Sequence, residues 1–225
     1  MSIIPGWTPG ALRAPVPPTI VYNGFGYASG NRSSHSISGV AIGAADPKRT
    51  VIILTSSRGV VGNPTVSGLT IGGISATQLT GTETPITYWV ANVPTGTTAT
   101  VAWTTSANTF YSGVESWAAY NLRDNDTAVE CDSEFSGLGN FDITRSIATE
   151  NNGVMALYAQ SIAGTNATPY SWTNATEDAD RTGYGAGTGA GAEHSVAHVE
   201  GAPPSSLSVT VSTNDEFTFY WLSMR

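Results

Sequence analysis

The sequence contains little charge. Charged residues make up 12% of its 225 residues, which is about half the usual share. Acidic residues outnumber basic ones by 17 to 9, and the net charge is −8. The chain therefore lacks the basic footprint that nucleic acids and anionic membranes require, and we expect neither as a partner.

Cysteine is almost absent as well. The single residue of this type, Cys131, excludes an internal disulfide framework. Its neighbours Glu130 and Asp132 are acidic, and their like charge disfavours the thiolate. We expect an unreactive thiol that the protein can do without.

Long hydrophobic runs are missing too. No stretch approaches the roughly 18 apolar residues of a membrane span. The first 18 residues contain five prolines and no continuous apolar core, so they do not have the pattern of a secretory signal peptide. We expect a protein that is not exported by the general secretory route.

Thr, Ser, Gly and Asn take the place of charge. Thr favours strands, whereas Gly and Asn favour turns. Residues 36–42 alternate between apolar and small or polar side chains, and 50–55 form a continuous apolar run, both typical of strands. Residues 112–122 could form a helix, but their β-branched and aromatic residues favour a strand. A Gly72-Gly73 pair predicts a tight hairpin.

Together these patterns predict an all-β protein. Short strands that alternate with turns, without a convincing helical period, indicate an antiparallel β-sandwich of the jelly-roll kind. We expect a single sandwich domain over residues 19–225, preceded by an extended arm over residues 1–18.

The expected arm is rich in proline, which favours extended backbone without hydrogen-bonded partners. It carries four large apolar side chains, which would gain little by remaining in water: Ile3, Ile4, Trp7 and Leu12. The arm either packs on its own domain or lies across a neighbouring subunit. In the second case these four residues are an assembly anchor.

Several patterns that could indicate a catalytic or cofactor site are weak. The glycines of residues 183–191 partly match a dinucleotide-binding fingerprint, but no amphipathic helix follows them, so a loop is the better interpretation. The chain has no Gly-x-Ser-x-Gly nucleophile elbow. We therefore expect a protein that is not an enzyme, with no catalytic residues and no cofactor.

Metal sites are equally weak. His194 and His198 lie on one face of an expected strand, but about 13 Å apart, which is too far for one ion to bridge. The acidic residues between 124 and 134 could bind calcium, although Glu130, Asp132 and Glu134 more simply form the wet face of a strand. We expect no metal, and leave calcium at this segment open.

Tryptophans are the remaining candidates for a binding site. Exposed rings on one sheet face can stack on sugars, whereas buried rings fill the space between two sheets. The second interpretation is favoured, because these rings stand inside apolar strands. Two or more exposed, coplanar rings would indicate a glycan site, and the candidates are Trp89, Trp103, Trp117 and Trp172.

Four phrases of the sequence have a familiar pattern: residues 43–51, 69–77, 93–101 and 172–177. With the closing aromatic strand they resemble uncharacterised β-sandwich virion structural proteins of tailed bacteriophages and prophages of alphaproteobacteria. The resemblance covers residues 40–225 but not the arm. These phrases are turns and strands, so they specify the fold better than the role.

The resemblance implies a non-enzymatic virion protein, either a capsid decoration protein of the cement or head-spike type or a tail accessory protein. Such a protein assembles in the host cytoplasm and is found in the virion. Its expected partners are the major capsid protein or other virion proteins, and its own copies in a homo-oligomer such as a trimer. The alternative is a carbohydrate-binding module or host-glycan adhesin that uses exposed Trp and Tyr side chains.

Overall fold

The computed structural model describes residues 16–60, 62, 64–79, 86–123, 128, 130–136, 141–145, 153–161, 170–184, 192–201, 206–211 and 217–225. These residues form fifteen strands, and the ladders between them are antiparallel. No helix occurs among them, and so none that could cross a membrane. The prediction of an all-β, antiparallel fold is therefore confirmed. The predicted arm lies outside the described residues up to position 15.

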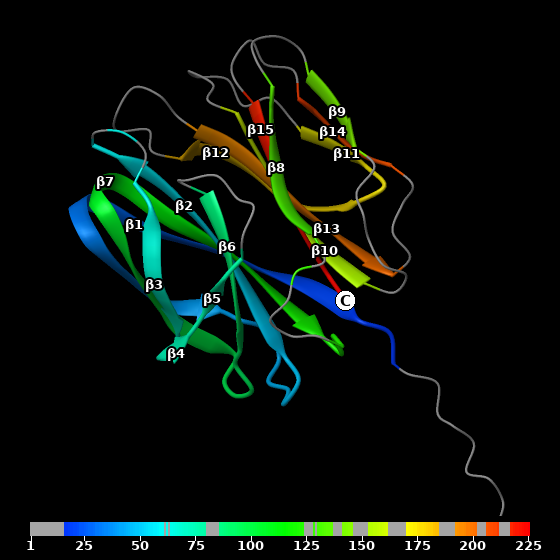
Figure 1. The fold of residues 1–225 in the computed structure, drawn as a ribbon, viewed down its shortest axis with the longest axis horizontal. Helices are drawn as coiled ribbons and strands as arrows, with labels where there is room; N and C mark the ends of the chain where they lie inside the picture. The colour runs from blue at the N-terminus through cyan, green and yellow to red at the C-terminus, as the bar shows by residue number, and fades with distance from the viewer. Residues whose placement is uncertain are drawn as a thin grey trace, which may run out of the picture.

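The first half of the chain forms one seven-stranded sheet, which we call sheet A (Figure 1). Its long central strand β7 pairs with β1 along one edge, and with β2 and β3 along the other. The full order is β4-β3-β7-β2-β6-β5, with β1 beside β7. Its strands are β1 (Thr19–Ala41), β2 (Thr50–Gly59), β3 (Val66–Ile71), β4 (Ile74–Ser75), β5 (Thr77–Gln78), β6 (Ile86–Asn92) and β7 (Thr98–Tyr120).

The second half of the chain forms two smaller sheets, on the other side of the molecule in Figure 1. Sheet B has the order β12-β13-β10-β15-β8, and sheet C the order β11-β14-β9. The strands of sheet B are β8 (Glu130–Ser136), β10 (Gly153–Ser161), β12 (Thr176–Tyr184), β13 (Ala192–Gly201) and β15 (Phe217–Met224). Those of sheet C are β9 (Phe141–Arg145), β11 (Tyr170–Thr173) and β14 (Leu207–Val211).

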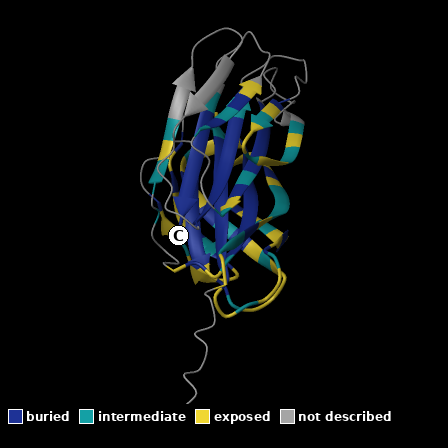
Figure 2. Ribbon diagram, turned by 90° about the vertical axis from the view of Figure 1, so that its right-hand side faces the viewer, coloured by how far each residue is buried: buried dark blue, intermediate teal, exposed yellow. Residues whose placement is uncertain are grey.

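Alternating side chains separate three hydrophobic clusters. On β2, Ile53 points into a cluster enclosed by sheet A, whereas Ile52 packs between sheets A and B. On β10, Val154 belongs to that same A–B cluster, and Met155 to a third cluster between sheets B and C. Each central strand is therefore buried on both faces, which explains its continuous apolar sequence. Figure 2 shows these buried strands in dark blue in the middle of the molecule.

A bulge in β7 lets one strand serve two clusters. Thr109 and Tyr111 pair with successive residues of β2, so Phe110 is the extra residue. Before the bulge Trp103 points into sheet A, and after it Trp117 points towards sheet B. An inserted residue changes which parity faces which side of a strand. Residues 112–120 belong to this strand, as predicted.

The hairpin predicted at the glycine pair is also confirmed. Ile71 of β3 pairs with Ile74 of β4, so the two glycines are the turn residues. Their φ angles are 61° for Gly72 and 83° for Gly73. Glycine adopts such positive values without the steric cost that other residues meet, which is why this pair marks a tight hairpin.

Candidate functional site

Three of the four tryptophan candidates are wrong as glycan-stacking residues. Trp89, Trp103 and Trp117 expose 4%, 2% and 0% of their surface. The indole N–H groups of Trp89 and Trp103 also donate hydrogen bonds inside the protein, to Thr55 Oγ1 at 3.3 Å and to Ser112 Oγ at 3.1 Å. Their rings fill the clusters on either face of sheet A, so a sugar cannot reach them.

Trp172 is half-buried and differs from the other three. Its indole N–H donates to Ser195 Oγ at 2.8 Å, and its ring lies 5.9 Å from that of Phe219. It therefore packs on the cluster between sheets B and C. Two exposed, coplanar rings are not present among the four candidates, so the observation that would have favoured a glycan site is not met.

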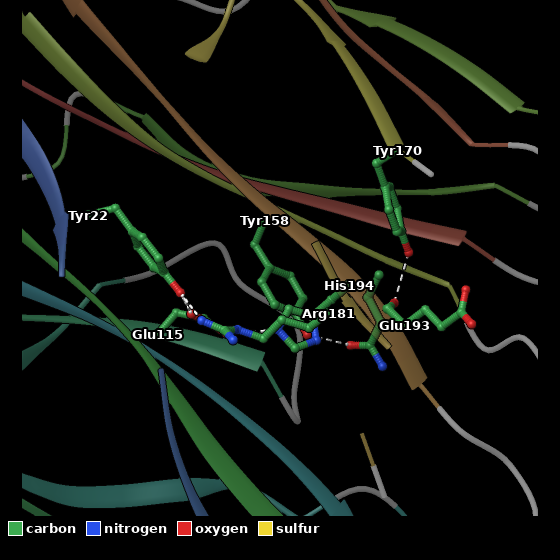
Figure 3. Close-up of polar contacts among 8 residues, drawn as sticks. Tyr22, Glu115, Tyr158, Tyr170, Arg181, Glu193 and His194 are labelled. Atoms are coloured by element: carbon green, nitrogen blue, oxygen red, sulfur yellow. Dashed lines mark hydrogen bonds and ion pairs between the residues drawn. The ribbon is translucent and has the colours of Figure 1, made fainter. Parts of the chain in front are cut away.

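The most unusual polar site is a buried carboxylate between sheets A and B. Glu115 of β7 exposes only 2% of its surface. Tyr22 of β1 donates its hydroxyl to Oε2 at 2.6 Å, and His194 Nε2 of β13 lies 2.7 Å from Oε1. Arg181 of β12 places Nε 3.5 Å from the same Oε1. Figure 3 shows these side chains converging on the carboxylate from both sheets.

The partners of Glu115 also contact one another. Arg181 donates from Nη2 to the Tyr22 hydroxyl at 2.7 Å, and its guanidinium lies 4.8 Å from the centre of the Phe25 ring. The ring of Tyr158 stacks on His194 at 5.2 Å. Hydrogen-bonded and packed on all sides, the carboxylate meets the conditions under which a buried charge is tolerated.

The environment also changes the ionisation of two of these partners. Burial, followed by the charge of Glu115, raises the pKa of Tyr22 well above its usual range, so its hydroxyl stays a donor. Burial alone would lower the pKa of Arg181, but the hydrogen bond with Tyr22 and the charge of Glu115 raise it. Arg181 therefore remains charged beside the carboxylate.

Two further carboxylates join the same pair of sheets. Asp178 of β12 accepts a hydrogen bond from the Trp117 indole of sheet A at 3.2 Å. Glu200 of β13 accepts one from the backbone N–H of Ile20 on β1 at 2.6 Å. With Glu115 they form what we call the seam: three carboxylates, Glu115, Asp178 and Glu200, each bonded across the boundary between sheets A and B.

The two histidines expected to share a strand face do so, and each contacts a carboxylate of the seam. His194 contacts Glu115, whereas His198 Nδ1 lies 2.8 Å from Asp178 Oδ1. Each histidine thus has its own carboxylate. Among the described residues, no three His, Cys, Asp or Glu side chains are grouped to hold a metal ion.

The His198 pair predicts that stability falls above neutral pH. Burial lowers the pKa of His198, but the hydrogen bond and charge of Asp178 outweigh it and raise the pKa above the ordinary value. A raised folded-state pKa adds stability that is complete below the unfolded pKa and is lost as pH rises through the folded one. We expect wild type to lose its stability advantage over His198→Gln as the pH rises above 6.5, the ordinary pKa of histidine, measured by urea unfolding. A pH-independent difference between the two proteins would contradict this.

The structure describes only part of the acidic segment and of the glycine tract that the sequence singled out. Residues 124–127 and 129 of the acidic segment lie outside the described residues, as do residues 185–191 of the glycine tract. Cys131 is half-buried against the A–B cluster. Burial, then the charge of Asp132, raise its pKa to about 12, so the thiol stays protonated. The sequence indicated the charge effect but not the larger effect of burial.

One buried charged residue was missed altogether. Arg49 is fully buried, and it donates only to backbone carbonyls. Nε donates to Val93 at 2.8 Å and Nη2 to Thr95 at 2.8 Å. Nη1 is shared among Gly43, Ala44 and Gly96 at 2.7, 2.9 and 2.8 Å.

These contacts join two loops that are distant in sequence. Residues 43–49 precede β2, and residues 93–97 follow β6, so Arg49 closes one end of sheet A. Glycine at position 43 lets the first loop pack against the end of β7. A Cβ at this position would lie 2.6 Å from both the Ala118 Cβ and the Tyr120 hydroxyl. Both loops belong to phrases that carry the resemblance, residues 43–51 and 93–101. Membership of these phrases was the only feature of the sequence that drew attention to the two loops.

Glu115, Asp178 and Arg49 share one role: each holds together segments that are distant in sequence. Their polar atoms face other parts of the protein, which suits them to stabilising the body. Comparisons with models of protein families, with curated proteins and with solved structures found no match for this chain.

Proposed function

We propose that the chain is a non-enzymatic structural protein of a tailed-bacteriophage virion, in the first place a capsid decoration protein of the cement or head-spike type. A tail accessory protein is the close variant. The observation that carries the proposal is the contact of Arg49 with both loops, 43–49 and 93–97. Two of the four phrases that resemble virion proteins, residues 43–51 and 93–101, are thus joined by one buried side chain.

The charge of the chain supports a place on the outside of the shell. Packaged DNA is a dense polyanion, and a protein with a net charge of −8 is repelled by it. The outer face of a capsid avoids that repulsion. The partners in this role are the major capsid protein and other copies of the chain, after assembly in the host cytoplasm.

The arm provides the test of this function. Strand β1 begins at Thr19, and Asn121 Nδ2 donates to the carbonyl of Pro17 at 3.5 Å, so a deletion of residues 1–15 spares the described body. We expect the deletion variant to keep its melting temperature but to fall at least tenfold in virion occupancy. The reason is that burial of each large apolar side chain contributes about 1.5–3 kcal/mol to a contact. Mass spectrometry of purified virions measures the occupancy.

A matched variant separates the length of the arm from its chemistry. Replacing Ile3, Ile4, Trp7 and Leu12 with serine keeps the arm but removes its apolar groups, and should reduce occupancy as the deletion does. Unfolding of the body by the deletion would show that the arm belongs to its own core. Full occupancy of both variants would remove the anchoring role, and absence of the wild-type chain from virions would overturn the proposed function.

A further inference from the structure

One exposed face of sheet A contains no charged residue. Residues 33–45, 64–79 and 86–114 include no Asp, Glu, Lys or Arg. They supply the second half of β1, all of β3 and β4, and the first half of β7, which are neighbours in the sheet. Their inward side chains, such as His35, Val101 and Trp103, are buried. The outward ones are chiefly Ser, Thr and Ala.

The outward side chains form regular rows across the strands. Ser34, Thr104 and Ser67 are cross-strand neighbours on β1, β7 and β3, and the hydroxyls of Ser67 and Thr104 lie 3.0 Å apart. The next row joins Ser36 through Ala102 to Thr70. Thr100 continues this surface on β7 and is exposed. We call this surface the neutral face.

Exposed positions elsewhere in the molecule are different. On β12, at the edge of sheet B, Glu177 and Asp180 are both exposed. A solvated sheet face ordinarily carries charged residues in this way. The neutral face differs from this edge of sheet B, because several of its adjacent strands carry no charge in a protein of net charge −8.

We propose that the neutral face is the contact surface for a second copy of this chain. Two copies of a protein with net charge −8 repel each other. This face is where they can approach without placing like charges in contact. Short Ser and Thr side chains also lose less conformational entropy on ordering than Lys or Glu, and their hydroxyls can pair across the contact.

The size of the face sets the strength of the contact. Four strands at about 4.8 Å spacing, the longest contributing roughly nine residues at about 3.4 Å each, give a footprint of at most roughly 14 by 27 Å. A stable interface buries about 800 Å² on each partner, which is more than this footprint. The contact is therefore weak between free molecules and becomes significant where many copies are held side by side. The choice of a second copy as partner rests on the proposed function, which requires such an arrangement.

Salt distinguishes this contact from one between complementary charges. Added salt screens the general repulsion between the two acidic copies, with a Debye length of about 10 Å at 0.1 M. Association through the neutral face therefore strengthens as the salt concentration rises. A contact that depends on opposite charges weakens instead.

The test uses the purified full chain in sedimentation velocity, over a range of protein and salt concentrations. We expect wild type to associate reversibly, more strongly at higher salt. The double variant Ser36→Glu/Thr100→Glu places charge on two exposed neighbouring positions and should raise the dissociation constant at least tenfold. The double variant Ser171→Glu/Thr173→Glu, at two exposed positions of β11 in sheet C, adds the same charge elsewhere and should change the dissociation constant far less.

Two results would overturn the inference. One is a wild-type protein that stays monomeric at the highest protein and salt concentrations. The other is a double variant that associates as wild type does, with an unchanged melting temperature to show that it is folded. Because no virion takes part in this experiment, its failure is distinct from failure of the proposed function, which is decided by virion occupancy.

Discussion

Arg49→Met is expected to lower the free energy of unfolding by roughly 4 kcal/mol or more, a loss that single substitutions seldom reach. Arg49 is fully buried, and methionine fills similar space but donates no hydrogen bond. Five carbonyl groups, those of Gly43, Ala44, Val93, Thr95 and Gly96, would lose a donor. Each carbonyl left unsatisfied in the interior costs about 1–3 kcal/mol.

Two further substitutions separate geometry from charge. Arg49→Lys keeps the charge, but an ammonium group has three donors at one point and cannot reach carbonyls on both loops, so it should lose nearly as much. Lys48→Met removes an equal charge from the adjacent exposed position and should change stability by less than about 0.5 kcal/mol. Urea unfolding measures all three. If Arg49→Met lowers the free energy of unfolding no more than Lys48→Met does, the two loops do not depend on Arg49.

The course of the chain was predictable wherever the signal was local. The apolar run of residues 50–55 lies in β2, and the glycine pair forms the turn between β3 and β4. The strand expected at residues 36–42 is the last part of β1 (Thr19–Ala41), but a register shift between Ile37 and Val40 interrupts its alternation. In each case neighbouring residues determine the structure through side-chain parity or backbone freedom.

The arrangement of the sheets was not predictable in the same way. Residues 141–145, 170–173 and 207–211 form a separate third sheet, which no local pattern in the sequence indicates. That depends on which strands pair, and pairing is decided by contacts between residues far apart in the chain. The division of β7 between two clusters depends likewise on a one-residue bulge at Phe110, for which the sequence has no distinctive signal.

The buried polar sites show the same limit. Arg49 binds backbone carbonyls more than 40 positions away, and carbonyls are present at every residue, so no pattern identifies them. Glu115 shares the parity of Trp117 in the sequence, which places both on one strand face. Its partners Arg181 and His194, however, come from the other half of the chain. Strand parity therefore places Glu115 on the same strand face as an aromatic residue, but it does not give the reason for the burial of Glu115.

Glu115→Gln should lower the free energy of unfolding by about 3 kcal/mol, the lower end of the range for breaking a buried ion pair. The amide keeps the shape of the side chain but removes the charge that faces Arg181 and His194. The amide also has one acceptor oxygen in place of two. It therefore cannot accept the hydrogen bonds of both Tyr22 and His194. Arg181 would then be left partly buried without its counter-ion. Glu177→Gln, an exposed carboxylate on β12, is the matched control and should change stability by less than about 0.5 kcal/mol.

A double-mutant cycle decides whether this loss comes from the seam itself. If Glu115 acts through Arg181, then combining Glu115→Gln with Arg181→Met costs less than the sum of the two, with a coupling energy of about 1–3 kcal/mol. A wild-type stability for Glu115→Gln, or strictly additive losses in the cycle, would mean that the pairing of Glu115 with Arg181 does not help to join sheets A and B. A measured coupling would show that the pairing of Glu115 with Arg181 adds to the apolar packing between the sheets.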